Sequence, residues 1–337
     1  MLFVPSLLLT VGGTTTFITG DMTVSGNTAN GVSNFIHNEG TLNINTDGTL
    51  VVNDAITGTN GVMHINNKEV SDRNNGTISL NSTISGNNIN LDGGILLLNA
   101  SGNIDDTSTL TANGGTLSLA NGVIGNKEIA NVNLVEDLII GIDVDLTIPD
   151  SDKFTSSNIE YNGKSILISI INIASDVSNS ATRVNVANEA MREHFGLADD
   201  IYIYAENAVQ GYSLEYEKET GDIVLDTSLN VVKITRATNR TRNYVMGADE
   251  VIKDELEDFA DKSSIGVLGN DDAVLTINGN GYSIDGTDAD SLGFVVNAGQ
   301  TLNLRNIGSA TLEYDEDGNL RGYRTYEYAL LSVLNIK

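Results

Sequence analysis

Short apolar strands alternate with polar turns through the first half of the chain. The phrase Gly76–Leu80 (GTISL) recurs at Gly94–Leu98 (GILLL) and at Gly115–Leu119 (GTLSL), so that the phrases begin 18 and then 21 residues apart. Each phrase has two aliphatic residues at alternate positions, which places both on one face of a strand. A strand-and-turn repeat of about 20 residues predicts a solenoid of stacked turns. We therefore expect a mainly β fold, a parallel β-helix.

Aliphatic spacing extends this β-helix over residues 21–149. Four pairs keep both members in phase: Ile78/Leu80, Leu96/Leu98, Leu117/Leu119 and Leu138/Ile140. Two longer inward-facing columns are also predicted: Val24, Ile44, Ile65, Ile84, Ile104, Ile124 and Val144, and Leu50, Val70, Ile89, Leu110 and Ile129. Glycine and asparagine, which tolerate positive φ, fill the corners between the strands.

A change of pattern at Pro149 predicts a small mixed α+β module over residues 150–264 that interrupts the solenoid. Strands are predicted at Ser165–Ile173 and Ile201–Ala205, and a hairpin at Tyr212–Leu225 with glycine in its turn. Apolar residues at helical spacing predict helices at Asn185–Ala198, with Asn185 as its cap, and at Ala248–Ala260.

The coil pattern returns at residues 265–337. Leu275–Ile277 is echoed 19 residues later by Phe294–Val296, and Ile284 is echoed 18 residues later by Leu302. An apolar strand, Leu330–Ile336, follows an acidic, tyrosine-rich stretch. At the other end, residues 1–20 contain the apolar run Leu2–Val11, for which a truncated leader and an N-terminal cap are alternatives; we expect the cap, because no basic residue precedes the run.

Composition narrows the kind of core and the kinds of partner. Tryptophan and cysteine are absent and aromatic residues make up 5%, so aliphatic side chains must fill the core, and a disulfide framework is excluded. The net charge of −27 argues against nucleic acid and anionic membrane surfaces as partners, because both repel an acidic chain. Residues 1–133 are nearly uncharged, with three basic and ten acidic side chains.

Candidate chemistry is sparse, and no catalytic, cofactor-binding or metal-ligating residue is predicted. The three histidines, His37, His64 and His194, have no metal-ligand spacing. Acidic pairs occur at Asp105-Asp106, Asp199-Asp200 and Asp271-Asp272; solvated turns explain them better than catalysis, although glycan-active enzymes use paired carboxylates. Asp315–Asn319 begins like a calcium loop but has Leu320 and Tyr326 at ligand positions.

Two further clusters fall in the interrupting module. One is basic and is expected to pair with the acidic segment Asp254–Asp261, with a glycan or phosphate contact as the alternative: Lys233, Arg236, Arg240 and Arg242. The other is aromatic and is expected to pack on the predicted helix, with a sugar or protein contact as the alternative: Tyr202, Tyr204, Tyr212 and Tyr216.

Three phrases resemble the passenger regions of bacterial autotransporter adhesins: GTLNINTDGTLVVN (40–53), GGTLSLANGVIGN (114–126) and the stretch from LTINGNG to LNLRNIG (275–308). The resemblance covers most of residues 20–308. It implies a right-handed, pectin-lyase-like β-helix at the bacterial cell surface or outside the cell, exported across the outer membrane by a C-terminal β-barrel. Residues 309–337 are too short for a barrel, so we expect the barrel outside this chain.

The resemblance and the composition together predict a non-enzymatic, adhesin-like passenger stalk, a monomeric rod without cofactor or metal. Its expected partner is a host or bacterial surface glycan or protein. The alternative is a β-helix enzyme acting on polysaccharide, a lyase or a hydrolase. Carboxylates and a basic residue converging in a groove on one coil face would favour the enzyme, whereas scattered turn acids would argue against it.

Overall fold

The computed structural model describes residues 9–174, 182–198, 212–226, 242–247, 249–253, 266–267, 274–279, 281–288, 294–295, 299–308, 311–314, 320–324 and 334–336. The chain divides into two compact units. The first comprises Met1–Ile173, Val184–Tyr204 and Lys218–Asp222, and the second Ala174–Arg183, Ala205–Glu217 and Ile223–Lys337. Each unit is described by itself.

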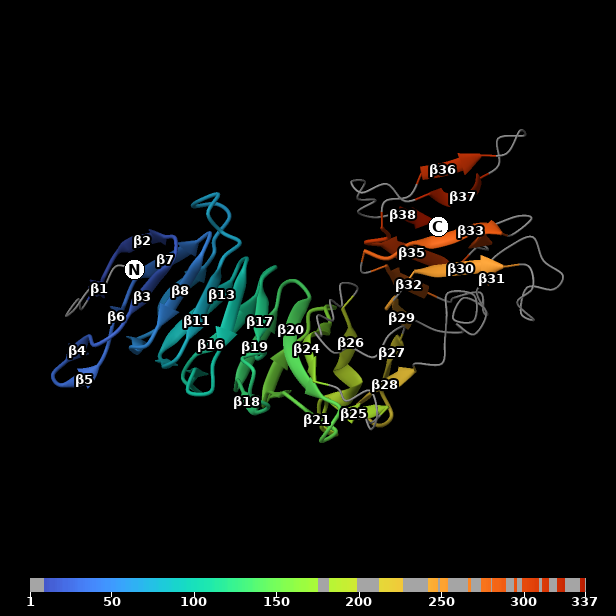
Figure 1. Cartoon of the computed structure of the whole chain (residues 1–337). Helices are drawn as coiled ribbons and strands as arrows, with labels where there is room; N and C mark the ends of the chain where they lie inside the picture. The colour runs from blue at the N-terminus through green and yellow to red at the C-terminus, as the bar shows by residue number, and fades with distance from the viewer. Residues whose placement is uncertain are drawn as a thin grey trace. The chain divides into compact units, whose positions relative to one another are not determined.

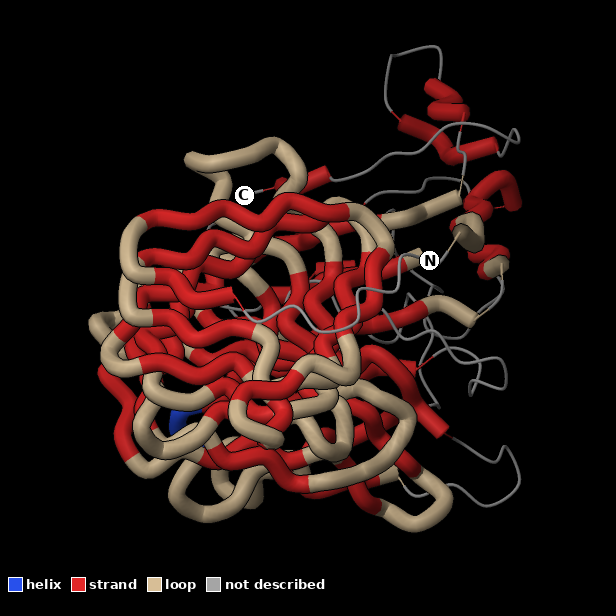
Figure 2. The backbone as a smooth tube through the Cα atoms, turned by 90° about the vertical axis from the view of Figure 1, so that its left-hand side faces the viewer, coloured by secondary structure: helices blue, strands red, loops and turns tan. Residues whose placement is uncertain are grey.

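The first unit is a parallel β-helix with three sheets, as the repeat predicts. Successive coils follow one another from blue to green in Figure 1, and Figure 2 shows their strands stacked as rows. Each regular coil contributes one strand to each of three parallel sheets, which follow one another along the chain as sheet III, sheet I and sheet II. Strands β7 (Thr41–Thr46), β8 (Thr49–Val52) and β9 (Ile56–Gly58) form one coil, and β10 (Gly61–Ile65), β11 (Thr77–Leu80) and β12 (Thr83–Ile84) form the next. Every strand of these coils therefore pairs in parallel with strands of the neighbouring coils.

The strands of each sheet are named here in order along the stack. Sheet I contains β3 (Met22–Val24), β8 (Thr49–Val52), β11 (Thr77–Leu80), β14 (Ile95–Leu98), β17 (Thr116–Ser118), β20 (Leu138–Asp145), β24 (Ile166–Ala174) and β26 (Phe195–Leu197), with β21 (Asp150–Ser151) antiparallel to β20. Sheet II contains β1 (Leu9–Val11), β6 (Ile36–Asn38), β9 (Ile56–Gly58), β12 (Thr83–Ile84) and β15 (Asn103–Ile104). Sheet III contains β2 (Thr14–Thr19), β7 (Thr41–Thr46), β10 (Gly61–Ile65), β13 (Asn87–Leu91), β16 (Thr109–Ala112), β19 (Asn131–Leu134) and β23 (Asn158–Glu160). Two small pairs complete the unit: β4 (Thr28–Ala29) with β5 (Val32–Ser33), and β18 (Asn126–Glu128) with β22 (Lys153–Thr155).

Aliphatic columns fill the interior of the coils. Each sheet contributes one such column: Leu50, Ile78, Leu96, Leu117 and Ile140 from sheet I, Ile36, Ile56, Ile84 and Ile104 from sheet II, and Leu42, Met63, Ile89, Leu110 and Val132 from sheet III. All of these side chains are buried. Each one stabilises the fold by about 1.5–3 kcal/mol relative to an exposed side chain.

The predicted register is correct where coils have equal length and wrong where a loop is inserted. Ile78/Leu80 pairs with Leu96/Leu98 as predicted, and the steps from Leu96 to Leu117, Ile84 to Ile104 and Ile89 to Leu110 are also confirmed. Other predicted steps are wrong. Leu117 pairs with Ile140 rather than with Leu138, and Val24 pairs with Val52 rather than with Ile44. Leu50 pairs with Ile78 rather than with Val70, which is an exposed loop residue, and Ile65 pairs with Leu91 rather than with Ile84. Spacing alone cannot reveal an insertion such as the loop over residues 66–76.

A column of glycines opens the strands of sheet I and explains the recurring glycine phrase. The amide N–H of Thr77 donates to the carbonyl of Gly48, and that of Ile95 to the carbonyl of Gly76 (2.8 and 3.0 Å), so the ladder continues through the glycines. A Cβ on Gly76 would lie 2.3 Å from the Gly48 oxygen, and one on Gly94 would lie 2.4 Å from the Gly76 oxygen. The close stacking of the coils therefore requires glycine at this corner.

Three buried asparagines fasten the corners between the coils. Asn66, at φ +53°, accepts a hydrogen bond from the Thr46 amide (2.9 Å) and donates one to the Gly76 carbonyl (3.0 Å). The side-chain amide of Asn38 donates to Asn87 Oδ1 (2.9 Å) at another corner. These amides satisfy backbone groups that the turns would otherwise leave buried and unpaired.

The second unit repeats the parallel pairing in fewer strands. Strands β29 (Arg242–Val245), β32 (Val274–Asn278) and β35 (Thr301–Arg305) pair in parallel, as do β30 (Glu250–Lys253) with β33 (Ile284–Asp288) and β31 (Gly266–Val267) with β34 (Phe294–Val295). The coils predicted after residue 265 therefore exist, but their register is wrong: Leu275 pairs with Leu302, and Phe294 pairs with Gly266.

The remaining strands of the second unit are antiparallel or form the predicted hairpin. Strand β38 (Leu334–Ile336) is antiparallel to β35, and β36 (Thr311–Tyr314) to β37 (Leu320–Arg324). The hairpin predicted at 212–225 is present as neighbouring strands β27 (Tyr212–Glu217) and β28 (Asp222–Asp226). In sheet I, the strand predicted at 165–173 is confirmed as β24.

Both predicted helices are wrong where the structure describes them. Residues 185–198 contain the end of β25 (Arg183–Asn185), one 3-10 turn (Arg192–His194) and β26. Phe195 pairs with Ile166 at the end of sheet I, so sheet pairing outweighs the helical spacing of the apolar residues. In the second predicted helix, Ala248–Ala260, residues 250–253 form β30, and residues 254–260 lie outside the described residues. The strand predicted at 201–205 also lies outside them.

We predict that Gly94→Ala destabilises the protein far more than Gly122→Ala. Both glycines have positive φ (+56° and +82°), so an alanine is strained at either position. Only at Gly94 would the new Cβ also lie 2.2 Å from the side-chain nitrogen of Asn66, whereas it meets nothing within 4 Å at Gly122. Denaturant unfolding should give Gly94→Ala an extra loss on the order of 1–3 kcal/mol. Equal losses in the two variants would contradict the stacking constraint.

A candidate polar recognition face

The outer face of sheet III carries two straight columns of polar side chains. The parallel register aligns the outward residues of seven strands: Thr14, Thr41, Val62, Asn88, Thr109, Asn131 and Asn158 in one column, and Thr16, Asn43, His64, Asn90, Thr111, Asn133 and Glu160 in the other. Neighbouring side chains of a column lie about 4.8 Å apart, and the two columns about 6.7 Å apart. Sheet III therefore presents a regular two-dimensional array.

This array differs from the rest of the chain in charge. Eleven of its fourteen positions are threonine or asparagine, and Glu160 at the end of the stack is its one acidic residue. The whole chain, by contrast, has a net charge of −27. Thr109, Thr111, Asn131 and Asn133 are half-buried; Asn131 donates to the carbonyls of Asp106 and Ser108, and Asn133 Oδ1 accepts a hydrogen bond from Asn162. Short hydroxyl and amide groups of this kind are both donors and acceptors of hydrogen bonds.

The inserted loop over residues 66–76 covers one part of the array. Asn67 donates to Asn43 Oδ1 (3.3 Å), and its carbonyl accepts a hydrogen bond from Asn45 (2.9 Å). Asn43 is consequently buried, at 4% exposure. The open part of the array runs from β13 to β19, beyond this loop.

Beside the loop, His64 forms a polar cluster with residues from the next two coils. His64 Nδ1 lies 2.7 Å from Asp92 Oδ2, and Asn113 Nδ2 donates to Asp92 Oδ1 (2.8 Å). The Asp92 side chain is 9% exposed, whereas that of His64 is 26% exposed. The carboxylate thus orients the imidazole, whose other nitrogen makes no hydrogen bond within the described residues. Sequence reasoning missed this cluster because its members are 28 and 21 residues apart.

The other predicted site residues have local partners. His37 contacts Thr57 and Glu39, and His194 stacks on Tyr161 with ring centroids 4.4 Å apart. Asp105 accepts hydrogen bonds from the amide and hydroxyl of Thr107 and so caps a turn, as expected for a solvated turn acid.

Several of the predicted candidates lie outside the described residues: Asp199-Asp200, Asp271-Asp272, Asp254–Asp261, Lys233, Arg236, Arg240, Tyr202, Tyr204 and Asp315–Asn319. Arg242 and Tyr212 belong to β29 and β27.

Two buried carboxylates, Asp143 and Asp152, form the most desolvated acidic pair in the first unit. Asp152 accepts hydrogen bonds from the amides of Gly125 (2.8 Å) and Asp143 (2.8 Å), and Asp143 from the amide of Gly122 (2.6 Å) and the side chain of Asn172 (2.6 Å). Burial raises the pKa of the Asp152 carboxyl to about 6, although both amides favour its charged form, and the neighbouring carboxylate of Asp143 raises it further.

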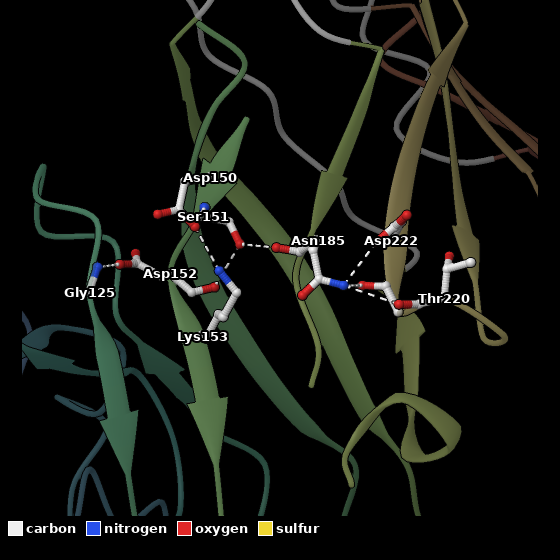
Figure 3. Close-up of polar contacts among 9 residues, drawn as sticks. Gly125, Asp150, Ser151, Asp152, Lys153, Asn185, Thr220 and Asp222 are labelled. Atoms are coloured by element: carbon white, nitrogen blue, oxygen red, sulfur yellow. Dashed lines mark hydrogen bonds and ion pairs between the residues drawn. The ribbon is translucent and has the colours of Figure 1, made fainter. Parts of the chain in front are cut away.

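Around Asp152 the chain is fastened by further polar contacts (Figure 3). Lys153 donates to Asp150 Oδ1 (2.6 Å), which lowers the pKa of Asp150, and Ser151 donates to the carbonyl of Asn185 (2.9 Å). Asn185 in turn donates to Asp222 Oδ1 (2.9 Å). Because these carboxylates bind backbone and side-chain donors of the protein, the network stabilises the turn.

Neither cofactor chemistry nor a known relative adds to this picture. Within the described ranges, no group of three histidine or acidic side chains has an arrangement that could hold a metal ion. The described part of the chain also contains no helix with the length and apolar character that crossing a membrane requires. Comparison with models of protein families, with curated proteins and with solved structures gives no match.

The raised pKa of Asp152 predicts a pH dependence of stability. An unfolded carboxyl has a pKa near 3.8, so between pH 4 and pH 6 the folded state binds more protons. The free energy of unfolding should then fall as the pH rises through this window, by on the order of 3 kcal/mol from this group. Urea unfolding at pH 4 and pH 7 should show this fall in the wild type and a smaller fall in Asp152→Asn.

A control separates this titration from the loss of a contact. Ser151→Ala removes the hydrogen bond to Asn185 but no carboxyl, so it should lower stability equally at both pH values. The assignment to Asp152 fails if Asp152→Asn and the wild type lose the same free energy between pH 4 and pH 7.

Proposed function

We propose that the chain is a non-enzymatic, adhesin-like protein of the bacterial cell surface or extracellular space, an autotransporter-type passenger, and that sheet III is its binding face. Its ligand is a neutral polysaccharide. The observation that carries the proposal is the threonine–asparagine array, uncharged between β13 and β19, on a chain of net charge −27. A neutral polymer is not repelled by the acidic chain, and its hydroxyls match the donors and acceptors of the array.

Multivalency supports the same proposal. Each column repeats one hydrogen-bonding group per coil, so a polymer lying along the array would contact several equivalent groups at once. Linked weak contacts of this kind give a higher affinity than any one of them. The array is built on strands held by their neighbours on both sides, so it loses little conformational entropy on binding.

The arrangement of acids favours binding over catalysis. Asp105 caps a turn, Asp143 and Asp152 bind backbone amides, and Asp92 orients His64. In the described ranges, therefore, no pair of exposed carboxylates converges with a basic residue on the open array between β13 and β19, as the alternative enzyme would require.

Binding to a panel of immobilised neutral polysaccharides (dextran, β-glucan, mannan, starch and chitin) tests the proposal. The wild type should bind at least one of them. Thr111→Lys places a long charged side chain in the middle of the array and should weaken that binding about tenfold or more, a change of about 1.4 kcal/mol. Thr116→Lys, at a half-buried outward position of sheet I, is the matched control and should leave binding unchanged.

Two results would contradict the proposal. Equal loss of binding in the two variants, with both folded by circular dichroism, would remove sheet III as the binding face. Release of reducing or unsaturated ends from any bound polymer would show an enzyme instead of an adhesin.

A further inference from the structure

Lys68 is an unusual cation in this structure. It lies on the inserted loop, is exposed, and is one of three basic residues in the first 133. No ion pair or hydrogen bond joins its ammonium group to any described residue, including the loop acids Glu69 and Asp72. By contrast, Arg73 on the same loop pairs with Asp47 (3.2 Å) and Lys164 pairs with Glu136 (2.7 Å).

The backbone places this ammonium group at the His64 cluster. A Cβ built on Gly114 would lie 3.4 Å from Lys68 Nζ, and one on Gly93 would lie 3.5 Å from its Cε. Gly114 follows Asn113, and Gly93 follows Asp92, the two residues that hold His64 in place. The lysine therefore extends over the corner where strands β13 and β16 end, next to Gly93 and Gly114.

Two donors thus meet at one end of the array. The Lys68 ammonium has no hydrogen-bond or ion-pair partner among the residues that the structure describes, and the Asn113 amide has a second N–H beyond the one that Asp92 accepts. His64 donates its Nδ1–H to Asp92, so the other nitrogen of the neutral ring is an acceptor and the histidine serves as a neighbour of these donors. The Asp92 side chain is largely buried, and both of its oxygens accept hydrogen bonds. The Lys68 ammonium is therefore the charged group that a ligand would meet. A positive group surrounded by neutral donors matches a single anionic group.

We infer that Lys68 and Asn113, at the corner where Asp92 accepts from His64, form a subsite for the anionic group of an acidic sugar, carried by an otherwise neutral polysaccharide. The inference rests on the polymer-binding role proposed above and narrows its ligand class. A densely charged polyanion is disfavoured because the rest of the chain is acidic, whereas an isolated carboxylate or sulfate on a neutral polymer meets only the local cation.

A monosaccharide titration followed by NMR tests the subsite without the polymer. The chain has three histidines, so the ring Hε1 signal of His64 can be assigned with the His64→Gln variant. We expect this signal to shift on addition of methyl β-glucuronide and to stay in place with methyl β-glucoside, which differs only in lacking the carboxylate. Methyl glucoside 6-sulfate is a third arm and distinguishes a sulfate from a carboxylate as the preferred anion.

Lys68→Gln should weaken the binding of the acidic sugar about fivefold, the ratio expected for one exposed charge contact. Lys164→Gln removes an equal charge from an ion pair elsewhere on the first unit and should have no effect. The subsite is overturned if the glucuronide causes no shift at His64, if the glucoside causes the same shift, or if Lys68→Gln and Lys164→Gln behave alike. The Thr111→Lys variant tests the array, and the monosaccharide titration tests the subsite. The two proposals can therefore be contradicted independently.

Discussion

Hydrogen bonding between successive coils is the constraint on which the rest of the first unit depends. The strands of the regular coils pair in parallel with strands about one coil away, so the side chains of one coil align with those of the next. The same register produces the buried aliphatic columns inside and the threonine–asparagine columns outside. Glycines such as Gly76 and Gly94 are required because a Cβ there would collide with the carbonyl oxygen of the preceding coil.

Polar residues in the interior stabilise this stacking. Asn66 and Asn38 bind backbone and side-chain groups of neighbouring coils, and Asp152 binds two amides at a turn. The buried carboxyl of Asp152 costs stability when it ionises, yet it satisfies donors that would otherwise be unpaired. On the outer face of sheet III, in contrast, the threonines and asparagines between β13 and β19 are exposed or half-buried.

The sequence pattern predicts the architecture because strands are rich in aliphatic residues and turns in glycine and asparagine. It fails to predict the register wherever pairing between distant parts of the chain determines it. The phrases at Gly76, Gly94 and Gly115 predict the right strands in the right sheet. The insertion over residues 66–76 shifts the register of Ile65 by several residues, and the spacing of aliphatic residues does not reveal it. The cluster of His64, Asp92 and Asn113 was equally hidden, because stacking brings together residues that are isolated in sequence. Helical spacing at 185–198 was misleading since Phe195 pairs with a sheet strand.

The most direct test of the central claim uses the absence of cysteine from the chain. Single cysteines at Thr111 in sheet III and at Thr116 in sheet I report on two faces of the same coil. Their rates of modification by a maleimide should be measured with and without a polysaccharide that the protein binds. The account predicts slower modification at position 111 and an unchanged rate at position 116. Protection at position 116 alone, or equal protection at both positions, would contradict it.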